Sequence, residues 1–204
     1  EGADHADIAR RIDEIWHQLD FGSVWYSIRQ RESADRMVAR FLDWQRGNDR
    51  ELVAVEQKLR VRIDDVVISG QVDRLERDAA GRAVVVDLKT GSSKPSSAEL
   101  ERNPQLGVYQ LAVLLGAFAE LGAAEPGGAE LVQVGKAAKV RQAAVQNQRA
   151  LADDPDPGWA QTLVKEVAAA MAGPRFAATA NDGCRRCPAA TSCPVDERGG
   201  QVTP

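Results

Sequence analysis

The sequence predicts an α/β protein in which helices flank a mixed central sheet that contains an antiparallel meander. Apolar and polar residues alternate between 52 and 89, and two turn signals interrupt the alternation, which is typical of three consecutive antiparallel strands. An apolar stretch with helical spacing follows at about 98–121. A strand expected at 130–135 then returns to the sheet after this helix, a connection that favours parallel pairing.

Residues 1–50 form an expected N-terminal helical segment. A stripe of apolar residues predicts an amphipathic helix over 3–20, namely Ile8, Ile12, Ile15, Trp16 and Leu19. A second helix is predicted from about Ser33 to Gln45, because apolar residues recur there at helical spacing and Gly47-Asn48-Asp49 is a stop signal.

The expected core, residues 51–176, begins with the meander. Turns at Asp64-Asp65 and Asp78–Gly81 divide it into strands at 52–63, 66–76 and 82–89. Side chains two apart share a face of a strand, so one face of the first strand is predicted to carry Val53, Val55, Gln57, Leu59, Val61 and Ile63. The β-branched run Val84–Val86 is typical of a buried strand.

The second half of the core alternates helices and strands. Pro104 divides the helix at 98–121, and Pro126-Gly127-Gly128 breaks the pattern before the strand at 130–135. The stretch 137–150 fits a strand or a helix, and residues 140–146 favour a strand. A loop at 152–158 and a helix at 159–172 complete the core, and the cysteine-containing tail, residues 177–204, shows no periodicity.

The composition excludes some classes of protein. With 204 residues, of which 44% are hydrophobic and 27% charged, the chain resembles a soluble globular domain. A net charge of −4 weakens the case for DNA binding but permits a local basic channel. No apolar stretch approaches the roughly 20 residues of a membrane span. We expect a soluble, cytoplasmic protein, and a start at Glu1 without Met or signal peptide indicates a piece of a longer one.

Three charged residues in neighbouring strands carry the clearest chemical signal. Asp87 and Lys89 end the buried third strand and share one face, and Asp73 stands near the end of the preceding run. A hairpin closed at Asp78–Gly81 brings the three together. Two carboxylates and an ammonium are suited to hold Mg²⁺ or Mn²⁺ and to activate a water against a phosphodiester, and the carbonyl of Leu88 would complete the metal shell. The alternative is that each is an ordinary charge at a strand end.

A polar pair in the following helix supports the catalytic interpretation. Gln105 and Tyr109 are four residues apart and share a helix face, where an amide and a phenol would hydrogen-bond the lysine, the carboxylates or a phosphate. The alternative assigns Tyr109 to the core and Gln105 to the surface.

All three cysteines lie within ten residues, as Cys184, Cys187 and Cys193. An odd, clustered set is a poor disulfide framework, and the spacing C-x2-C-x5-C is typical of metal or cluster ligation. Three thiolates alone would take zinc with an external ligand or stay empty.

Together, Asp73, the run Asp87-Leu88-Lys89-Thr90-Gly91 and the Gln105–Tyr109 pair resemble the PD-(D/E)XK nucleases of the RecB type, over about residues 50–195. With the cysteine tail they resemble the subset that carries an iron–sulfur staple, such as the AddAB and AdnAB helicase–nucleases. This resemblance implies a restriction-endonuclease-like core, with Asp73 and Asp87 as metal ligands, Lys89 as the catalytic lysine and Gln105 and Tyr109 as supporting residues. Glu56, on the first strand, matches an acidic residue of the family more weakly.

The resemblance also implies cofactors and partners. The cofactors are Mg or Mn in the nuclease site and a 4Fe-4S cluster, which Cys184, Cys187 and Cys193 would hold with a fourth cysteine outside this chain. The partners are DNA with single-stranded ends, helicase domains of the same polypeptide and a second helicase–nuclease subunit. The family histidine has no good match: His5 and His17 lie outside the expected motif, so we expect it, too, upstream of residue 1.

Three functions compete at this point. The first is a metal-dependent DNA exonuclease domain of a helicase–nuclease in double-strand-break repair. The second is an inactive module of the same fold that guides DNA or docks a subunit. The third, a structural cysteine-rich metal domain, leaves Asp73, Asp87 and Lys89 unexplained.

Overall fold

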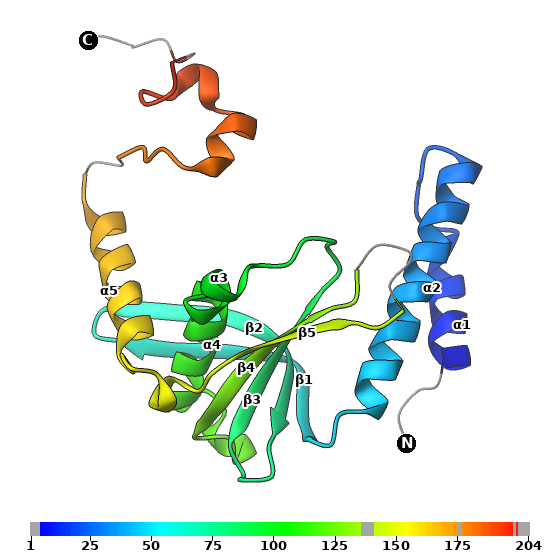
Figure 1. The fold of residues 1–204 in the computed structure, drawn as a ribbon, viewed down its shortest axis with the longest axis horizontal. Helices are drawn as coiled ribbons and strands as arrows, with labels where there is room; N and C mark the ends of the chain where they lie inside the picture. The colour runs from blue at the N-terminus through cyan, green and yellow to red at the C-terminus, as the bar shows by residue number, and fades with distance from the viewer. Residues whose placement is uncertain (1–4, 136–140, 175–176, 198, 200–204) are drawn as a thin grey trace. The chain divides into compact units, whose positions relative to one another are not determined.

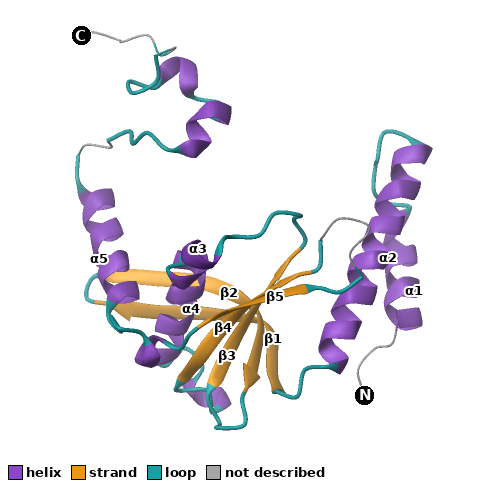
Figure 2. Cartoon of the chain, in the orientation of Figure 1, coloured by secondary structure: helices purple, strands orange, loops and turns teal. Residues whose placement is uncertain are grey.

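The computed structural model shows a five-stranded sheet with helices on both faces (Figures 1 and 2), and it describes residues 5–135, 141–174, 177–197 and 199. Contacts divide the chain into residues 1–164 and 165–204, which are described separately. The main elements are α1 (His5–Trp16), α2 (Val24–Arg46), β1 (Glu51–Ile63), β2 (Val66–Arg77), β3 (Ala83–Lys89), α3 (Ser97–Glu101), α4 (Pro104–Leu114), β4 (Pro126–Gln133), β5 (Ala144–Gln148) and α5 (Trp159–Ala172). Short 3₁₀ turns occupy Ala119–Leu121, Leu151–Asp153, Asp182–Arg186 and Ala190–Ser192.

The sheet order β1-β2-β3-β4-β5 confirms the predicted topology. The strands β1, β2 and β3 form the antiparallel meander, and β4 pairs parallel to β3 after the crossover through α3 and α4. The edge strand β5 pairs antiparallel to β4. Both faces of β3 are covered, which is why its β-branched residues Val85 and Val86 are completely buried.

Each face of the sheet has its own apolar core. On one face α4 packs against a cluster that includes Leu75, Val85 and Leu131. On the other face Phe41 and Trp44 of α2 pack against a cluster that includes Val84, Val86, Val132 and Val134. Polar contacts also dock α2: the guanidinium of Arg40 donates to the carbonyl of Val134 at 2.6 Å, and the indole of Trp44 donates to Glu130 at 3.0 Å.

The β1–β2 ribbon separates from the rest of the sheet. β2 pairs with β3 only from Arg74 to Arg77, whereas β1 and β2 stay paired out to the hairpin turn after Ile63. At the point of separation Glu56 has a φ of 48°, a left-handed conformation that non-glycine residues rarely adopt. A split therefore opens between β2 and β3 just beyond Arg74.

Several predicted boundaries were wrong at the ends of helices. The helix expected over 3–20 ends at Trp16. The helix expected from Ser33 begins at Val24, because the hydroxyl of Ser23 accepts from the N–H of Tyr26 and caps it. The predicted division of the stretch 98–121 at Pro104 is confirmed, because Asn103 caps a new helix there, but α4 ends at Leu114 and not near residue 121.

The strand predictions also need correction. β4 begins at Pro126, so Pro126-Gly127-Gly128 belongs to the strand and is no break, and it ends at Gln133. Val55 is 57% exposed, because the alternation expected along β1 is interrupted at Glu56, whose left-handed φ of 48° separates Val55 from the buried Leu59 and Val61. β5 occupies 144–148 and not 140–146, and residues 137–140 lie outside the described part of the chain.

Candidate active site

The C-terminal end of β3 carries Asp87 and Lys89 on one face. Asp87 is 3% exposed, and its Oδ2 lies 2.7 Å from the ammonium of Lys89. The contact is an ion pair without hydrogen-bond geometry, because Oδ2 of Asp87 has no hydrogen-bond partner. The carbonyl of Lys89 accepts from the N–H groups of Val134 and Gly135, so the lysine side chain extends from an anchored backbone.

Asp73 lies in the split between β2 and β3. Its Oδ2 accepts from the N–H of Leu88 at 2.8 Å, an N–H that faces the gap left where β2–β3 pairing ends at Arg74 and Val86. The Leu88 peptide therefore lies between Asp73 and Asp87. As predicted, the hairpin brings the two aspartates to one place.

The first turns of α4 complete the site. The amide of Gln105 donates to Oδ1 of Asp87 at 2.8 Å and accepts from the ammonium of Lys89 at 2.9 Å. The same amide donates to the hydroxyl of Tyr109 at 3.1 Å, and that hydroxyl donates to the carbonyl of Gln71 at 3.0 Å. Tyr109 also packs against the apolar core. The structure thus brings together all five predicted residues, and their chemical roles remain a proposal.

The electrostatics of the site centre on Asp87. Burial raises the pKa of its carboxyl above the usual range, and the negative charge of Asp73 raises the pKa further, while the nearby ammonium of Lys89 opposes the shift. Two carboxylates and one ammonium leave the site one negative charge in excess. A cation beside them would offset the cost of keeping Asp87 ionised.

The donor set fits a hard divalent cation. Oδ2 of Asp87 is buried and makes no hydrogen bond beyond its ion pair with the ammonium of Lys89, so lone pairs of this oxygen remain available to a metal ion. Among the described residues no three His, Cys, Asp or Glu side chains gather into a metal-holding set, so a cation here would take its carboxylate ligands from Asp73 and Asp87 alone. Mg²⁺ is commonly bound by one or two carboxylates, with water and substrate phosphate in the remaining positions.

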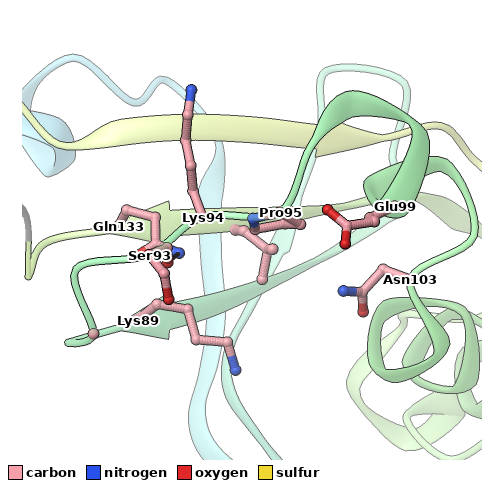
Figure 3. Close-up of a pocket in the computed structure, with 9 residues that line it drawn as sticks. Lys89, Ser93, Lys94, Pro95, Glu99, Asn103 and Gln133 are labelled. Atoms are coloured by element: carbon pink, nitrogen blue, oxygen red, sulfur yellow. Dashed lines mark hydrogen bonds between the residues drawn. The ribbon is translucent and has the colours of Figure 1, made fainter. Parts of the chain in front are cut away.

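A cavity of about 430 Å³ adjoins Lys89 (Figure 3). Its walls come from the end of β3, the loop before α3, the start of α4 and the end of β4; they include Lys89, Ser93, Glu99, Asn103 and Gln133. Gln133 is 2% exposed, and its amide donates to the carbonyl of Ser93 at 3.0 Å. The cavity offers room for substrate beside the ammonium of Lys89.

Sequence reasoning missed two residues near the site. The backbone carbonyl of Gln71 accepts a hydrogen bond from the hydroxyl of Tyr109, and the side-chain amide of Gln71 donates to Glu56. The register of β1 with β2 places Glu56 opposite Asp73. Gln133 lies beside Lys89 in the parallel register. A signal was present for Gln133 alone, because it is a polar residue that ends an apolar strand.

The other predicted ligands lie elsewhere or do not assemble. His5 is the first residue of α1, and no hydrogen bond or ion pair of the described residues joins His5 or His17 to the site. Cys184, Cys187 and Cys193 lie in or beside two short 3₁₀ turns, without a disulfide, and the described residues do not gather them into a metal-holding set. We therefore derive no chemical step through a cluster.

Two features characterise the class to which this protein belongs. A mixed sheet presents two aspartates and a lysine at a strand end, and the next helix places a glutamine and a tyrosine beside them. A family model described as the PD-(D/E)XK nuclease superfamily matches residues 1–194. The chain therefore belongs to the PD-(D/E)XK nuclease superfamily, whose members are in general metal-dependent nucleases. This confirms the superfamily and the restriction-endonuclease-like fold that the sequence predicted.

Two further comparisons add little. The chain is similar to a solved structure described as the crystal structure of SSO0001, with 20% identity over 85% of this chain and 80% of that chain and a TM-score of 0.42, a likeness that carries no argument. No protein of curated function matches the chain significantly. Among the described residues, no helix is both long and apolar enough to cross a membrane.

Proposed function

We propose that this protein is a Mg²⁺- or Mn²⁺-dependent deoxyribonuclease that hydrolyses phosphodiesters at the site formed by Asp73, Asp87 and Lys89. The observation that carries the proposal is the closed set of contacts among Asp87, Lys89 and Gln105, with Asp73 across the Leu88 peptide. A bound divalent cation would supply a Lewis acid for the phosphate and lower the pKa of a water.

The side chains divide the remaining tasks. Asp73 and Asp87 hold the cation, with the carbonyl of Leu88 as a third ligand. Lys89 orients the attacking water and stabilises the negative charge that develops on the phosphate. Gln105 holds the ammonium of Lys89 and the carboxylate of Asp87 in position, and Tyr109 holds Gln105 against the β1–β2 ribbon.

We extend the proposal to an exonuclease module of a RecB-like helicase–nuclease in double-strand-break repair. It would act in the cytoplasm on single-stranded DNA ends, together with helicase domains and a second subunit. The resemblance of the motifs supports this context. The competing function is an inactive module that guides DNA or docks a subunit. The presence of Asp73, Asp87 and Lys89 together favours catalysis, since an inactive copy of the fold has no need to retain all three.

Cleavage of end-labelled single-stranded DNA with Mg²⁺ or Mn²⁺ tests the proposal. The expected result is cleavage by the unmodified protein and at least a hundredfold loss in Asp87→Ala. Asp65→Ala is the control, because Asp65 lies exposed in the β1–β2 turn and the same charge is removed there. Equal rates for the unmodified protein and Asp87→Ala would reject nuclease activity at this site.

We also propose, from the spacing of Cys184, Cys187 and Cys193 alone, that the tail binds a 4Fe-4S cluster in a longer form of the protein. Anaerobically purified longer protein would then show a broad visible absorption band that Cys187→Ser removes. Protein without iron would reject the assignment.

A further inference from the structure

One face of the β1–β2 ribbon carries a row of three cations. Leu59, Val61 and Ile63 are buried, and the residues that alternate with them, Lys58, Arg60 and Arg62, are exposed on the opposite face. Because a strand rises about 3.3 Å per residue, the row spans about 13 Å from Lys58 to Arg62.

Within the part of the chain that the structure describes, these cations have no acidic partners. No ion pair of the described residues includes Lys58, Arg60 or Arg62. Their neighbours across the ribbon are Gln71, Ser69 and Val67, all exposed and all uncharged. By contrast, Arg77 at the other end of the same ribbon pairs with Glu51 at 2.7 Å. The chain has a net charge of −4, so an unpaired positive row is a local departure from its overall charge.

The row begins at the candidate active site. Lys58 lies opposite Gln71, and the carbonyl of Gln71 accepts from the hydroxyl of Tyr109 at 3.0 Å. The split that holds Asp73 is two residues further along β2. From there the row runs outward to Arg62, which lies just before the hairpin turn.

We propose that Lys58, Arg60 and Arg62 bind the sugar–phosphate backbone of single-stranded nucleic acid that extends from the active site. The location of the scissile phosphate rests on the proposed function; the binding row itself does not. A line of lysine and arginine side chains along an extended strand neutralises successive phosphates of an extended polymer without reading its sequence. The row would supply the local basic surface that the acidic net charge conceals.

The test is binding of a fluorescent single-stranded oligonucleotide of about 30 nucleotides to the protein in EDTA, where no hydrolysis occurs. Lys58→Gln, Arg60→Gln and Arg62→Gln are combined in one variant. The control combines Arg10→Gln, Arg11→Gln and Arg46→Gln, three exposed residues of α1 and α2 whose loss changes the net charge equally. Circular dichroism melting verifies that both variants are folded.

The expected result is affinity roughly tenfold lower for the ribbon variant at about 0.1 M salt, and a slope of log affinity against log salt that is smaller by about two. The control should bind like the unmodified protein. Equal loss in both variants would show an effect of net charge and overturn the proposal. Unchanged affinity of the ribbon variant would overturn it too. If that variant also self-associates, the three cations serve instead to prevent aggregation at the edge of the sheet.

Metal-dependent cleavage of dinucleotides, whose single phosphodiester would occupy the active site and leave no phosphate for the row, separates this proposal from the nuclease function. If the ribbon variant loses binding of the long oligonucleotide and no form of the protein cleaves DNA, the row is supported and the nuclease function fails. If the short substrate is cleaved and long-oligonucleotide binding does not change, the nuclease function stands and the row is rejected.

Discussion

Gly107 is a position where we expect a single methyl group to disturb the site. It lies in α4 between Gln105 and Tyr109, and its buried backbone faces the six-membered ring of Trp159. A Cβ at this position would be 2.2 Å from Cη2 of Trp159 and 2.6 Å from Cζ2. Ordinary carbon–carbon contacts are about 3.5–4.0 Å, so the ring or α4 must retreat by more than an ångström.

The free energy of unfolding of Gly107→Ala follows from two opposing effects. Alanine gains about 1 kcal/mol in helix propensity over glycine. Overpacking a buried site costs about 1–3 kcal/mol, and displacing the Trp159 ring from its cluster with Ile63, Leu111 and Leu151 costs about 3–5 kcal/mol. The net expectation is a loss of about 3–7 kcal/mol, or a decrease in Tm of roughly 6–28 °C for a chain of this length.

Chemical denaturation of single and double variants checks this reasoning. Gly158→Ala is the control, because its Cβ would meet only Oδ1 of Asp156 at 3.8 Å, and we expect a change within about 0.5 kcal/mol. Trp159→Leu removes all three ring atoms near Gly107. In that background Gly107→Ala should be neutral or stabilising. If it is as destabilising there as alone, the clash with Trp159 is the wrong explanation.

Two further predictions concern buried polar groups. Asp87→Asn should raise the Tm of the metal-free protein at neutral pH and abolish the increase in Tm that Mn²⁺ causes. Because the pKa of Asp87 is raised in the folded protein, the stability that this carboxyl contributes is present at acid pH and is lost as the pH rises through that pKa. Thermal melts from pH 4 to pH 8 check this, and a Tm difference that does not widen with pH would contradict it. Gln110→Leu should lower the free energy of unfolding in urea by about 2–4 kcal/mol. The buried amide of Gln110 donates to Gln148 at 2.9 Å and accepts from the N–H of Leu151 at 3.0 Å, and the substitution would leave both partners unsatisfied. A loss below about 1 kcal/mol would show that water replaces the amide.

Local patterns along the chain predicted most of the strands and part of the site. Alternation and turn residues located β1, β2 and β3 within a residue or two, and the polar residues Asp87 and Lys89 stand out because they interrupt an apolar run. Gln105 and Tyr109 stand out through their helical spacing. These signals are local, since period and side-chain chemistry can be read from neighbouring residues.

Other features depend on contacts between distant segments. Val55 is exposed because the left-handed backbone of Glu56, where the β1–β2 ribbon separates from the sheet, interrupts the alternation of β1. β4 begins at Pro126 because Gly127 and Gly128 permit close approach to Asp78 and Gln148. The role of Gln71 depends on the phenol of Tyr109, which is 38 residues away in the chain. No pattern within either segment contains that information.

The sequence by itself determined the class of fold, the superfamily and the five side chains of the candidate site, because strand periodicity and residue chemistry are properties of short segments. Only the tertiary structure decided that Gln105 bridges Asp87 and Lys89, that Asp73 fills the split between β2 and β3, and that three cations extend from that split with no ion-pair partner among the described residues. Those arrangements depend on register, on the separation of the β1–β2 ribbon from β3 and on the docking of α4. Each is a property of how strands and helices meet, which the residues of one segment do not specify.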